Sequence, residues 1–452
     1  MGFRGQAFAF DSPAAAVAAL VARACPAPAV RPSEGVGLNE AAGRILAEDI
    51  RADRDTPSFD YSAMDGYAVR AADLAAHVQA GSTESAQPIT LPVVGESRIG
   101  EPPPSFDGDR RPFAVRIATG APIPPGADAV VRREDALEHA VERLAGDSAI
   151  SVTPAAVARL RRGDHIRCRG ENAPAGTVVL HAGEVITVSG LATIVAVGIA
   201  RPAVFARLRI AVITTGDELV EPHHAPSTFQ IRNSNATAVR AILASHAWAE
   251  VTSVSHIRDD GDLGGALEHA CQVADAVVLT GGVSMGHRDP VRAVVEQMRA
   301  EILFHGLPQR PGKPILGAIL RRPSSQPAKA VPIFGLPGNP VSALVTCVRI
   351  VLPVLAACAG AKRTPPRCLP QLIEVRNPDG RTLDLWWHRL VRLVVNAEGL
   401  PQAELIDGRG SGDIIAAGRS NGFVEIPPGS VSAFLPYYAW PAGACLPVND
   451  VC

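Results

Sequence analysis

The chain has 452 residues, a length typical of about three compact domains. Hydrophobic residues make up 47% of it and charged residues 19%, which excludes a disordered chain. Its 43 lysines and arginines nearly balance 45 aspartates and glutamates, so bulk charge indicates no nucleic-acid partner. Among the basic residues, lysine is rare and occurs at Lys313, Lys329 and Lys362 alone.

The first predicted element is a helix that begins at Pro13, with Ser12 as its N-cap. Its alanines imitate a secretory signal, but Asp11 stands where the apolar run of a signal should begin. The most apolar later segment, residues 341–361, contains Arg349 and is interpreted as a buried helix rather than a membrane span. Eight scattered cysteines without zinc spacing indicate thiols in a reducing compartment. We expect a cytoplasmic protein that contacts no membrane.

Changes in composition predict an α/β plus β protein with several regions. Residues 1–56 and 165–206 indicate one helical or mixed region of discontinuous sequence. Between them, residues 57–164 are rich in proline, glycine and short Val/Ile runs, which favours an inserted β domain. Residues 207–362 alternate strands with helices, the pattern of a parallel sheet. Residues 363–452 contain β-like pieces and are interpreted as a separate β domain.

Within the α/β region, the strands are predicted at residues 209–214, 251–257, 276–279 and 330–334, with helices at 235–248 and 263–273. The strand pieces elsewhere are predicted at 89–94, 129–131, 383–387, 390–395, 422–426 and 437–440, and a further helix at 188–197. Each strand of the α/β region ends in a loop with glycines or acids. Ligands of open α/β sheets bind beyond these strand ends, so we expect the loops to converge on one site.

One of these loops, Thr280–Gly286, has three glycines and a serine directly after a buried strand. Its backbone N–H groups are suited to an anion, although the alternative is a sharp turn without a ligand. The acids Glu218, Asp259 and Asp289 are assigned to a metal–phosphate site, because Mg²⁺ takes oxygen ligands. For Asp217 and Asp260 we favour a structural role near helix N-termini.

A second candidate is the turn Arg310–Pro314, in which two prolines hold a backbone that projects two cations. A rigid turn of this kind suits an oxyanion, although the alternative is a solvated basic loop. The scarcity of lysine favours function for Lys313. Asp65, in the turn Ser62–Ala68, gives no role by pattern alone, since an Asp before Gly is usually a turn former. The histidines are isolated and predict no zinc site.

Seven motifs occur in order along the chain: Ser62–Ala68, Thr119–Asp128, Arg169–Asn172, Thr215–Leu219, Gly281–Asp289, Arg310–Pro314 and Leu336–Val341. Together they resemble the molybdopterin molybdenumtransferase family, that is, the MoeA proteins and the gephyrin E-domain relatives. The resemblance covers the chain from about residue 12 onward and implies an elongated homodimer. It also implies a molybdopterin-binding three-layer α/β domain, an inserted β domain and a C-terminal β-barrel-like domain. The implied reaction inserts molybdate into adenylylated molybdopterin, with Mg²⁺-dependent loss of AMP.

The resemblance also implies roles for individual residues. Glu218, Asp259 and Asp289 match acids around the nucleotide and Mg²⁺, and with Asp65 they form the catalytic set. Asp65 and Thr119 match positions that approach the site from the partner subunit. The residues matching molybdopterin and phosphate contacts are Thr119, Gly281, Gly282, Ser284, Pro337, Asn339 and Pro340. Those matching the molybdate pocket are Arg310, Lys313, Pro314, Arg389 and Ser411.

Four positions depart from the family pattern. Asn172 stands where some members have Asp, and Gly306 stands where some members have Lys. Arg310 replaces the usual Lys, and His287 stands where an acid is frequent.

Two alternative functions remain beside the leading hypothesis. A molybdopterin adenylyltransferase shares only the α/β domain, and a non-catalytic molybdopterin-binding scaffold would not need the intact acids and Lys313. The resemblance suggests molybdopterin adenylyltransferase and molybdoenzyme maturation factors as protein partners.

Overall fold

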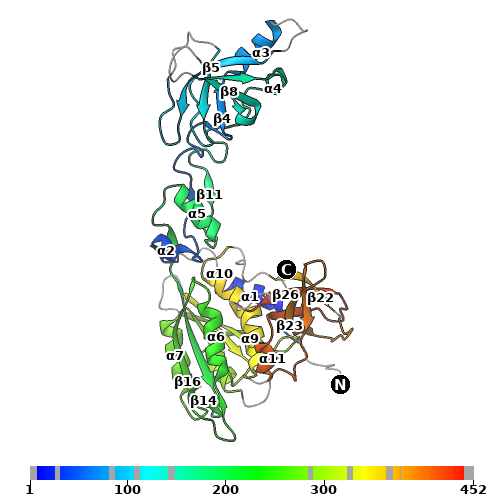
Figure 1. Cartoon of the computed structure of the whole chain (residues 1–452). Helices are drawn as coiled ribbons and strands as arrows, with labels where there is room; N and C mark the ends of the chain where they lie inside the picture. Colours follow the sequence, from blue (N-terminus) through cyan, green and yellow to red (C-terminus); the bar gives the residue numbers. More distant parts are fainter. Residues whose placement is uncertain are drawn as a thin grey trace. The chain divides into compact units, whose positions relative to one another are not determined.

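The computed structural model describes residues 8–25, 31–80, 87–105, 112–140, 148–283, 289–322, 329–362, 370–376 and 378–441. These residues form two compact units, whose elements are labelled in Figure 1. Unit 1 comprises Met1–Asp49, His181–Val195 and Ile199–Cys452, and unit 2 comprises Ile50–Leu180 and Ala196–Gly198. We describe each unit by itself.

Unit 2 is built on a six-stranded sheet with the strand order β7-β4-β6-β5-β9-β8. Its strands are β4 (Gly66–Val69), β5 (Ile89–Ser97), β6 (Ala114–Ile117), β7 (Ala129–Arg132), β8 (Ala136–Ala140) and β9 (Ser148–Val152). Smaller elements are β2 (Ile50–Arg51), β3 (Tyr61–Ser62), α3 (Ala71–Ala80), η1 (Arg133–Asp135), α4 (Pro154–Arg159), β10 (Ile166–Arg167) and β11 (Val178–Leu180). Leu91, Ile150 and Val152 are fully buried in its core. The prediction of an inserted β domain is confirmed.

Unit 1 contains a sheet with the strand order β16-β13-β17-β21-β20-β18. Its strands are β13 (Leu208–Thr215), β16 (Ala249–Ile257), β17 (Ala276–Thr280), β18 (Glu301–His305), β20 (Leu316–Arg322) and β21 (Lys329–Leu336). The sequence prediction of a parallel sheet holds for the first four strands in this order. It missed β18 and β20, which pair antiparallel and follow one another without a helix between them.

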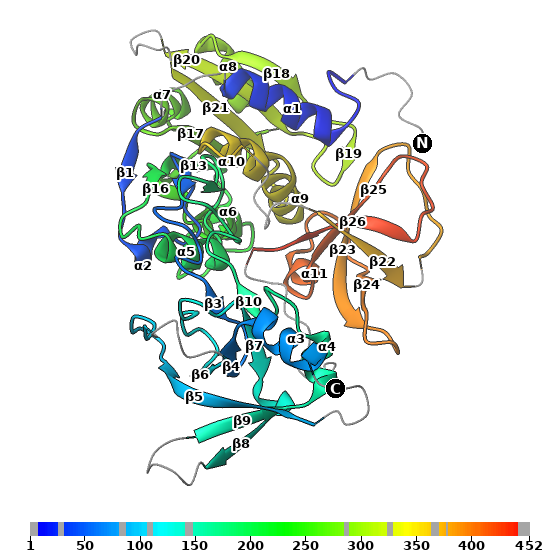
Figure 2. The same cartoon turned by 90° about the horizontal axis from the view of Figure 1, so that it is seen from above.

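Helices cover both faces of this sheet, as alternating side chains on its strands require. Ile210 and Val212 pack into one core, while their neighbours Ala211 and Ile213 pack into another. The helices over the two faces are α1 (Pro13–Ala24), α6 (Ser234–Ala244), α7 (Leu263–Val273), α8 (Pro290–Gln297), α9 (Pro340–Thr346) and α10 (Leu352–Cys358). The three-layer architecture is therefore confirmed (Figure 2).

Two helix boundaries show what the local sequence controls. The predicted cap of α1 is confirmed, because the Ser12 hydroxyl accepts a hydrogen bond from the Ala15 N–H at 3.2 Å. Helix α6 ends four residues earlier than predicted, at Ala244 rather than Trp248. The Ser245 hydroxyl donates a hydrogen bond to the Ile242 carbonyl, and the chain then turns so that Trp248 enters the core.

Other short elements of unit 1 are β1 (Ser33–Gly35), α2 (Leu38–Ala41), β12 (Ala203–Phe205), β14 (Leu219–Val220) and β15 (Ile231–Arg232). Helix α5 (Val188–Ala196) belongs to unit 1 except for its last residue, Ala196, which is assigned to unit 2.

The C-terminal part of unit 1 is a five-stranded barrel, closed because β25 pairs with β23 as well as β26. Its strands are β22 (Gln371–Arg376), β23 (Trp386–Val395), β24 (Pro401–Leu405), β25 (Gly422–Ile426) and β26 (Phe434–Ala439). The short strand β19 (Gln309–Arg310), which comes earlier in the chain, lies beside β23 at the edge of the same sheet. The two pieces predicted at 383–387 and 390–395 are one continuous strand, β23. Strands β22 and β24 and helix α11 (Ile414–Gly418) were not predicted.

A long apolar helix joins the α/β sheet to the barrel. Helix α9 continues through the π-helical turn Cys347–Val351 (η2) into α10, giving 19 residues of mean hydropathy 2.2. Length and composition alone would allow this helix to cross a membrane, but 78% of its apolar window is buried in the protein. The prediction of a buried core helix is thereby confirmed. Its core continues into barrel residues Leu390 and Phe423.

Inside this junction, Arg349 meets a carboxylate of the barrel. Its guanidinium donates hydrogen bonds to Glu425 at 2.5 and 3.2 Å, and His388 Nε2 lies 3.0 Å from the same carboxylate. Burial opposes ionisation of Glu425, but the hydrogen bonds from His388 and Arg349 outweigh it and lower its pKa from 4.5 to about 2. The network therefore holds a buried negative charge between two basic side chains.

We expect Glu425→Gln to lower the free energy of unfolding by about 3–5 kcal/mol, because it leaves the buried Arg349 charge uncompensated. Since the folded-state pKa of Glu425 is depressed, its contribution is complete above pH 4.5 and is lost as pH falls toward 2. Urea unfolding at pH 7 and pH 3 measures both effects. A destabilisation by Glu425→Gln that is the same at both pH values would contradict this assignment.

Candidate functional site

The predicted site loops in unit 1 lie at one edge of the sheet. Strands β16, β13, β17 and β21 run parallel and are neighbours, so their carboxyl ends meet. Two contacts between the loops confirm this convergence. The Gly281 N–H lies 3.3 Å from the Leu336 carbonyl oxygen, and the Asp259 N–H donates to Asp217 Oδ1 at 3.1 Å.

The glycine loop after β17 requires glycine for steric reasons. Gly281 has a φ of +91°, and a Cβ there would lie 2.4 Å from the Thr215 carbonyl oxygen. Gly282 follows with a φ of +65°. The two glycines therefore give this loop a backbone conformation that other residues rarely adopt, close against the end of β13. Predicted residue Ser284 and the departure at His287 lie outside the described residues.

A residue that sequence reasoning missed, Asn235, joins two of these loops. Its side-chain amide donates to Thr280 Oγ at 2.9 Å and to the Gly338 carbonyl at 2.8 Å. Two residues earlier, Asn233 caps α6 and donates to Thr214 Oγ at 2.9 Å. The start of α6 thus ties the ends of β13 and β17 to the loop after β21. An asparagine before a helix, such as Asn233, signals a cap, but only the fold shows the contacts that Asn235 makes inside the first turn.

The acids of the site differ in their surroundings. Glu218 and Asp259 are exposed, and the Asp217 carboxylate accepts the Asp259 N–H. Arg258 lies 3.6 Å from Asp217 and 3.5 Å from Asp260, so these two acids pair with an arginine rather than with a helix N-terminus as expected. Helix α7 is capped by Asp262 instead, whose Oδ1 accepts the Gly265 N–H at 2.7 Å.

Asp289 is the most buried of the predicted acids, with 8% of its surface exposed. It caps α8, since Oδ1 accepts the Arg292 N–H at 3.0 Å. Its second oxygen, Oδ2, lies 2.9 Å from His305 Nε2. The histidine that sequence analysis left without a role therefore sits against a predicted catalytic acid. One carboxylate oxygen maintains the helix while the other faces a group that can carry charge.

The predicted acids were tested against the needs of a divalent cation. No group of three or more Asp, Glu, His or Cys side chains suited to a metal occurs among the residues that the structure describes. Glu218 and Asp259 are nevertheless exposed oxygen donors at the ends of adjacent strands. Mg²⁺ characteristically binds one or two carboxylates and completes its shell with water and substrate phosphate. The donor set fits such a substrate-bridged ion rather than a protein-enclosed one.

A buried glutamine contacts the basic turn Arg310–Pro314. Gln309, 1% exposed, donates from Nε2 to the Gly312 carbonyl at 2.9 Å. Gly312 has a φ of +90°, and a Cβ there would lie 2.4 Å from Thr346 Cγ2 on α9. Arg310 is exposed, whereas Lys313 is half-buried with its Nζ 5.6 Å from the centre of the Phe8 ring. Pro314, which completes the turn, is half-buried.

Predicted residues from the loop after β21 and from the barrel meet at the start of α9. Asn339 Nδ2 donates to Ser411 Oγ at 3.0 Å, and the Val341 N–H donates to the Ser411 carbonyl at 3.0 Å. Asn339 occupies the N-cap position before Pro340, but its side chain makes no capping hydrogen bond because it binds Ser411. The loop Pro337–Pro340 and the barrel therefore form one surface.

Arg389 is already partnered by acids. Its guanidinium pairs with Asp379, lies 3.5 Å from Asp407 and stacks 4.7 Å from the centre of the Trp387 ring. With 8% of its surface exposed, it lines a barrel cavity of about 30 Å³. That volume has room for about one water molecule. Binding an oxyanion at Arg389 would require these carboxylates to move.

In unit 2, Asp65 and Thr119 are joined by hydrogen bonds, although they lie 54 positions apart in the sequence. The Thr119 backbone N–H and hydroxyl donate to Asp65 Oδ1 at 2.7 and 2.9 Å. The backbone hydrogen bond from Thr119 is the main cause that lowers the pKa of Asp65. The adjacent Gly66 is required by packing, since a Cβ there would lie 2.0 Å from the Val131 carbonyl oxygen. The turn therefore displays an exposed carboxylate that remains ionised.

Comparison with known proteins supports the resemblance over most of the chain. Residues 12–198 match the MoeA N-terminal region (domain I and II), and residues 211–357 match a probable molybdopterin binding domain. The molybdopterin molybdenumtransferase of Synechococcus elongatus is 35% identical over 359 residues, 78% of this chain and 82% of the relative. The Haemophilus influenzae protein of the same name is 34% identical over 408 residues, 89% and 92% of the two chains.

A solved structure extends the likeness to three dimensions. The molybdopterin biosynthesis MoeA protein of Pyrococcus horikosii is 28% identical and superposes with a TM-score of 0.66, covering 95% of this chain and 98% of that one. The motifs, the convergent strand ends and these relatives agree with one another. The chain belongs to the MoeA family of molybdopterin molybdenumtransferases and is a transferase of molybdenum cofactor biosynthesis.

Proposed function

We propose that this enzyme inserts molybdate into adenylylated molybdopterin, with Mg²⁺-dependent release of AMP. The observation that carries the proposal is the convergence of the glycine loop, the Pro337–Pro340 loop and Ser411 at one edge of the sheet. A phosphate-bearing ligand suits this edge, because glycine loops and strand ends offer backbone N–H groups. The names of the curated relatives supply the substrate class.

In this proposal, Gly281 and Gly282 face the phosphate that links molybdopterin to AMP. Glu218 and Asp259 would hold Mg²⁺ together with that phosphate, and Asp289 would add negative charge nearby. When bound, Mg²⁺ neutralises phosphate charge that develops as the bond to AMP breaks. The protein itself contributes rigidity: Asn235 holds the two loops at a fixed separation, so the phosphate contacts are in place before the substrate binds.

Molybdate is a tetrahedral dianion, and the turn Arg310–Pro314 is proposed to bind it. Arg310 offers a planar fork of donors, and Lys313 a compact charge. Gln309 keeps the turn in shape through its bond to Gly312. Arg389 is proposed as a further molybdate ligand. Its guanidinium would release Asp379 when it binds the oxyanion, so Asp379 competes with molybdate for Arg389. Ser411 would place its hydroxyl beside this pocket.

We further propose a homodimer in which Asp65 and Thr119 act on the site of the partner subunit. Support comes from the exposed, hydrogen-bonded carboxylate of unit 2, which belongs to a different unit from the other predicted site residues. The proposed setting is the cytoplasm, where molybdopterin adenylyltransferase would supply the substrate and maturation factors would receive the product. The second candidate function, a molybdopterin-binding scaffold, shares these surfaces but requires no turnover.

Release of AMP separates the two functions. We expect the purified chain to release AMP from adenylylated molybdopterin only when molybdate and Mg²⁺ are both present, since each supplies a different part of the site. Chromatography of the nucleotide products measures the reaction, and omission of each component in turn is the control. Tight binding of adenylylated molybdopterin without AMP release would favour the scaffold, and AMP release without molybdate would contradict coupled insertion.

A further inference from the structure

Two thiols from opposite ends of the sequence meet on the sheet face covered by α1 and α10. Cys25 is the C-cap of α1, where its backbone N–H donates to the Val21 carbonyl at 2.9 Å. Cys358 is the last residue of α10, which packs against α1. The two sulfur atoms lie 3.1 Å apart, and both cysteines are reduced. The two helix ends therefore place the sulfur atoms in direct contact with one another.

We propose that Cys25 and Cys358 form an oxidation site, in which Cys25 attacks a hydroperoxide and Cys358 then closes a disulfide. Closing the bond requires the sulfur atoms to approach to about 2.05 Å, a movement of about 1 Å from their present separation. Cys25 and Cys358 are both partly exposed and can meet a small oxidant, whereas Cys271 and Cys347 are buried. A reactive thiol beside a resolving thiol is the usual arrangement of reversible cysteine oxidation.

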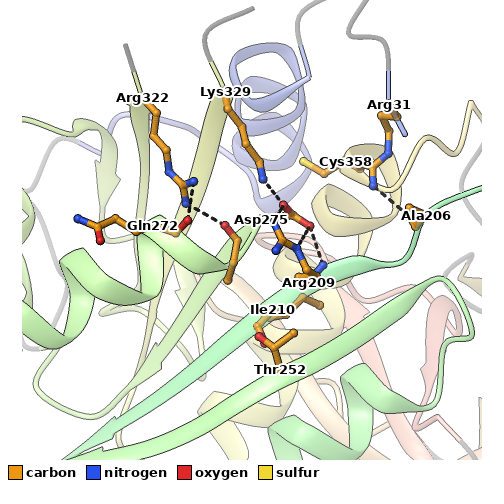
Figure 3. A network of polar contacts seen from close by, with 11 residues as sticks. Arg31, Ala206, Arg209, Ile210, Thr252, Gln272, Asp275, Arg322, Lys329 and Cys358 are labelled. Carbon is orange, nitrogen blue, oxygen red and sulfur yellow. Dashed lines mark hydrogen bonds and ion pairs between the residues drawn. The ribbon is translucent and has the colours of Figure 1, made fainter. Parts of the chain in front are cut away.

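Charge around the pair assigns the two roles. The hydrogen bond from Cys358 and the nearby Arg31 guanidinium lower the pKa of Cys25, although burial opposes them. Arg31 is fixed there because it donates to the Cys358 carbonyl and, at 3.3 Å, to the Ala206 carbonyl (Figure 3). The bond to Cys25 and burial raise the pKa of Cys358 well above its usual value. Cys25 is thus the more acidic of the two thiols, and the thiolate is the form that attacks peroxide.

The proposed chemistry balances in two steps. The Cys25 thiolate attacks one peroxide oxygen, the O–O bond breaks, and a proton from solvent completes the sulfenic acid and one water. The Cys358 sulfur then attacks the Cys25 sulfur, the S–O bond breaks, and water leaves with the Cys358 proton. Two thiols are oxidised by two electrons and one hydrogen peroxide is reduced to two waters. Oxidation of Cys25 also removes the negative partner that opposed ionisation of Cys358.

The test uses the full chain and hydrogen peroxide. We expect near-stoichiometric peroxide to lower the intact mass by about 2 Da, the mass of the two hydrogens lost. Free thiols should fall by two of the eight, and peptide mapping should identify a Cys25–Cys358 cross-link that dithiothreitol removes. A cross-link between other cysteines, or oxidation with no Cys25–Cys358 peptide, would overturn the proposal. This readout uses the wild-type chain and needs no variant to fold.

Variants test the order of the steps. Cys358→Ser should leave Cys25 as a sulfenic acid that a 1,3-dione probe labels, whereas Cys25→Ser should remove both label and cross-link. Cys168→Ser is the matched control, because Cys168 is exposed but has no second thiol within hydrogen-bonding reach among the described residues. A background with Cys368, Cys445 and Cys452 changed to serine removes the thiols outside those residues. Labelling of Cys358 in place of Cys25 would reverse the assigned roles and contradict the proposal.

Discussion

Asp289→Asn should abolish AMP release while the protein remains folded. Asparagine keeps an oxygen that can accept the Arg292 N–H and is among the best N-cap residues, so α8 should keep its first turn. It loses the negative charge that faces His305. Loss of a preorganised electrostatic group of this kind lowers turnover by about 10²–10³-fold. Initial rates of AMP release with saturating molybdate and Mg²⁺ measure the effect.

The matched control is Asp262→Asn, the same chemical change at the cap of the neighbouring helix α7. That variant should release AMP at the wild-type rate. Asp289→Ala should lose activity as Asp289→Asn does and, in addition, about 1 kcal/mol of stability through the missing cap. Wild-type turnover by Asp289→Asn would show that the carboxylate serves α8 alone.

Mixing two inactive variants should restore activity if Asp65 serves the partner subunit. Asp65→Ala and Lys313→Ala should each be inactive as homodimers, because every site contains one defect. In a mixed dimer, one site receives both defects and the other receives none. Random assembly makes half of the dimers mixed, so co-expression should recover about a quarter of wild-type AMP release per subunit.

The control for this experiment pairs Arg310→Ala with Lys313→Ala. Both changes lie in the same turn, so each site of the mixed dimer keeps one defect and no activity should return. Failure of Asp65→Ala and Lys313→Ala to complement, in dimers shown to be mixed, would mean that Asp65 serves the site of its own chain. A protein that stays monomeric at working concentration would contradict the shared site directly.

Local sequence patterns predicted the strands and helices that depend on neighbours along the chain. Helix α7 was predicted with its observed ends, because a capping Asp262 precedes an amphipathic run. The pattern did not show β18 and β20, since their antiparallel partners are chosen by contacts across the sheet. The same holds in the barrel for β22 and β24, whose short segments gain their stability from pairing with other strands.

The candidate site divides in the same way. Motif spacing located the glycine loop and the acids, and the structure brings their loops to one sheet edge. Motif spacing could not predict the hydrogen bonds and ion pairs that these side chains make with distant parts of the chain. Asn235 reaches across to Gly338, and Asp379 occupies the guanidinium of Arg389. These contacts join residues far apart in sequence, so no local pattern encodes them.

The long helix that begins at Pro340 limits how the molecule can be divided. A chain shortened to end at Lys362 would leave the Arg349 guanidinium without Glu425 and would expose an apolar surface now covered by Leu390 and Phe423. Such a fragment should aggregate rather than fold autonomously. The α/β sheet and the barrel should therefore be exchanged between relatives only together. Chimeric proteins joined at the boundary of unit 2 should fold, whereas chimeric proteins joined directly after this helix should not.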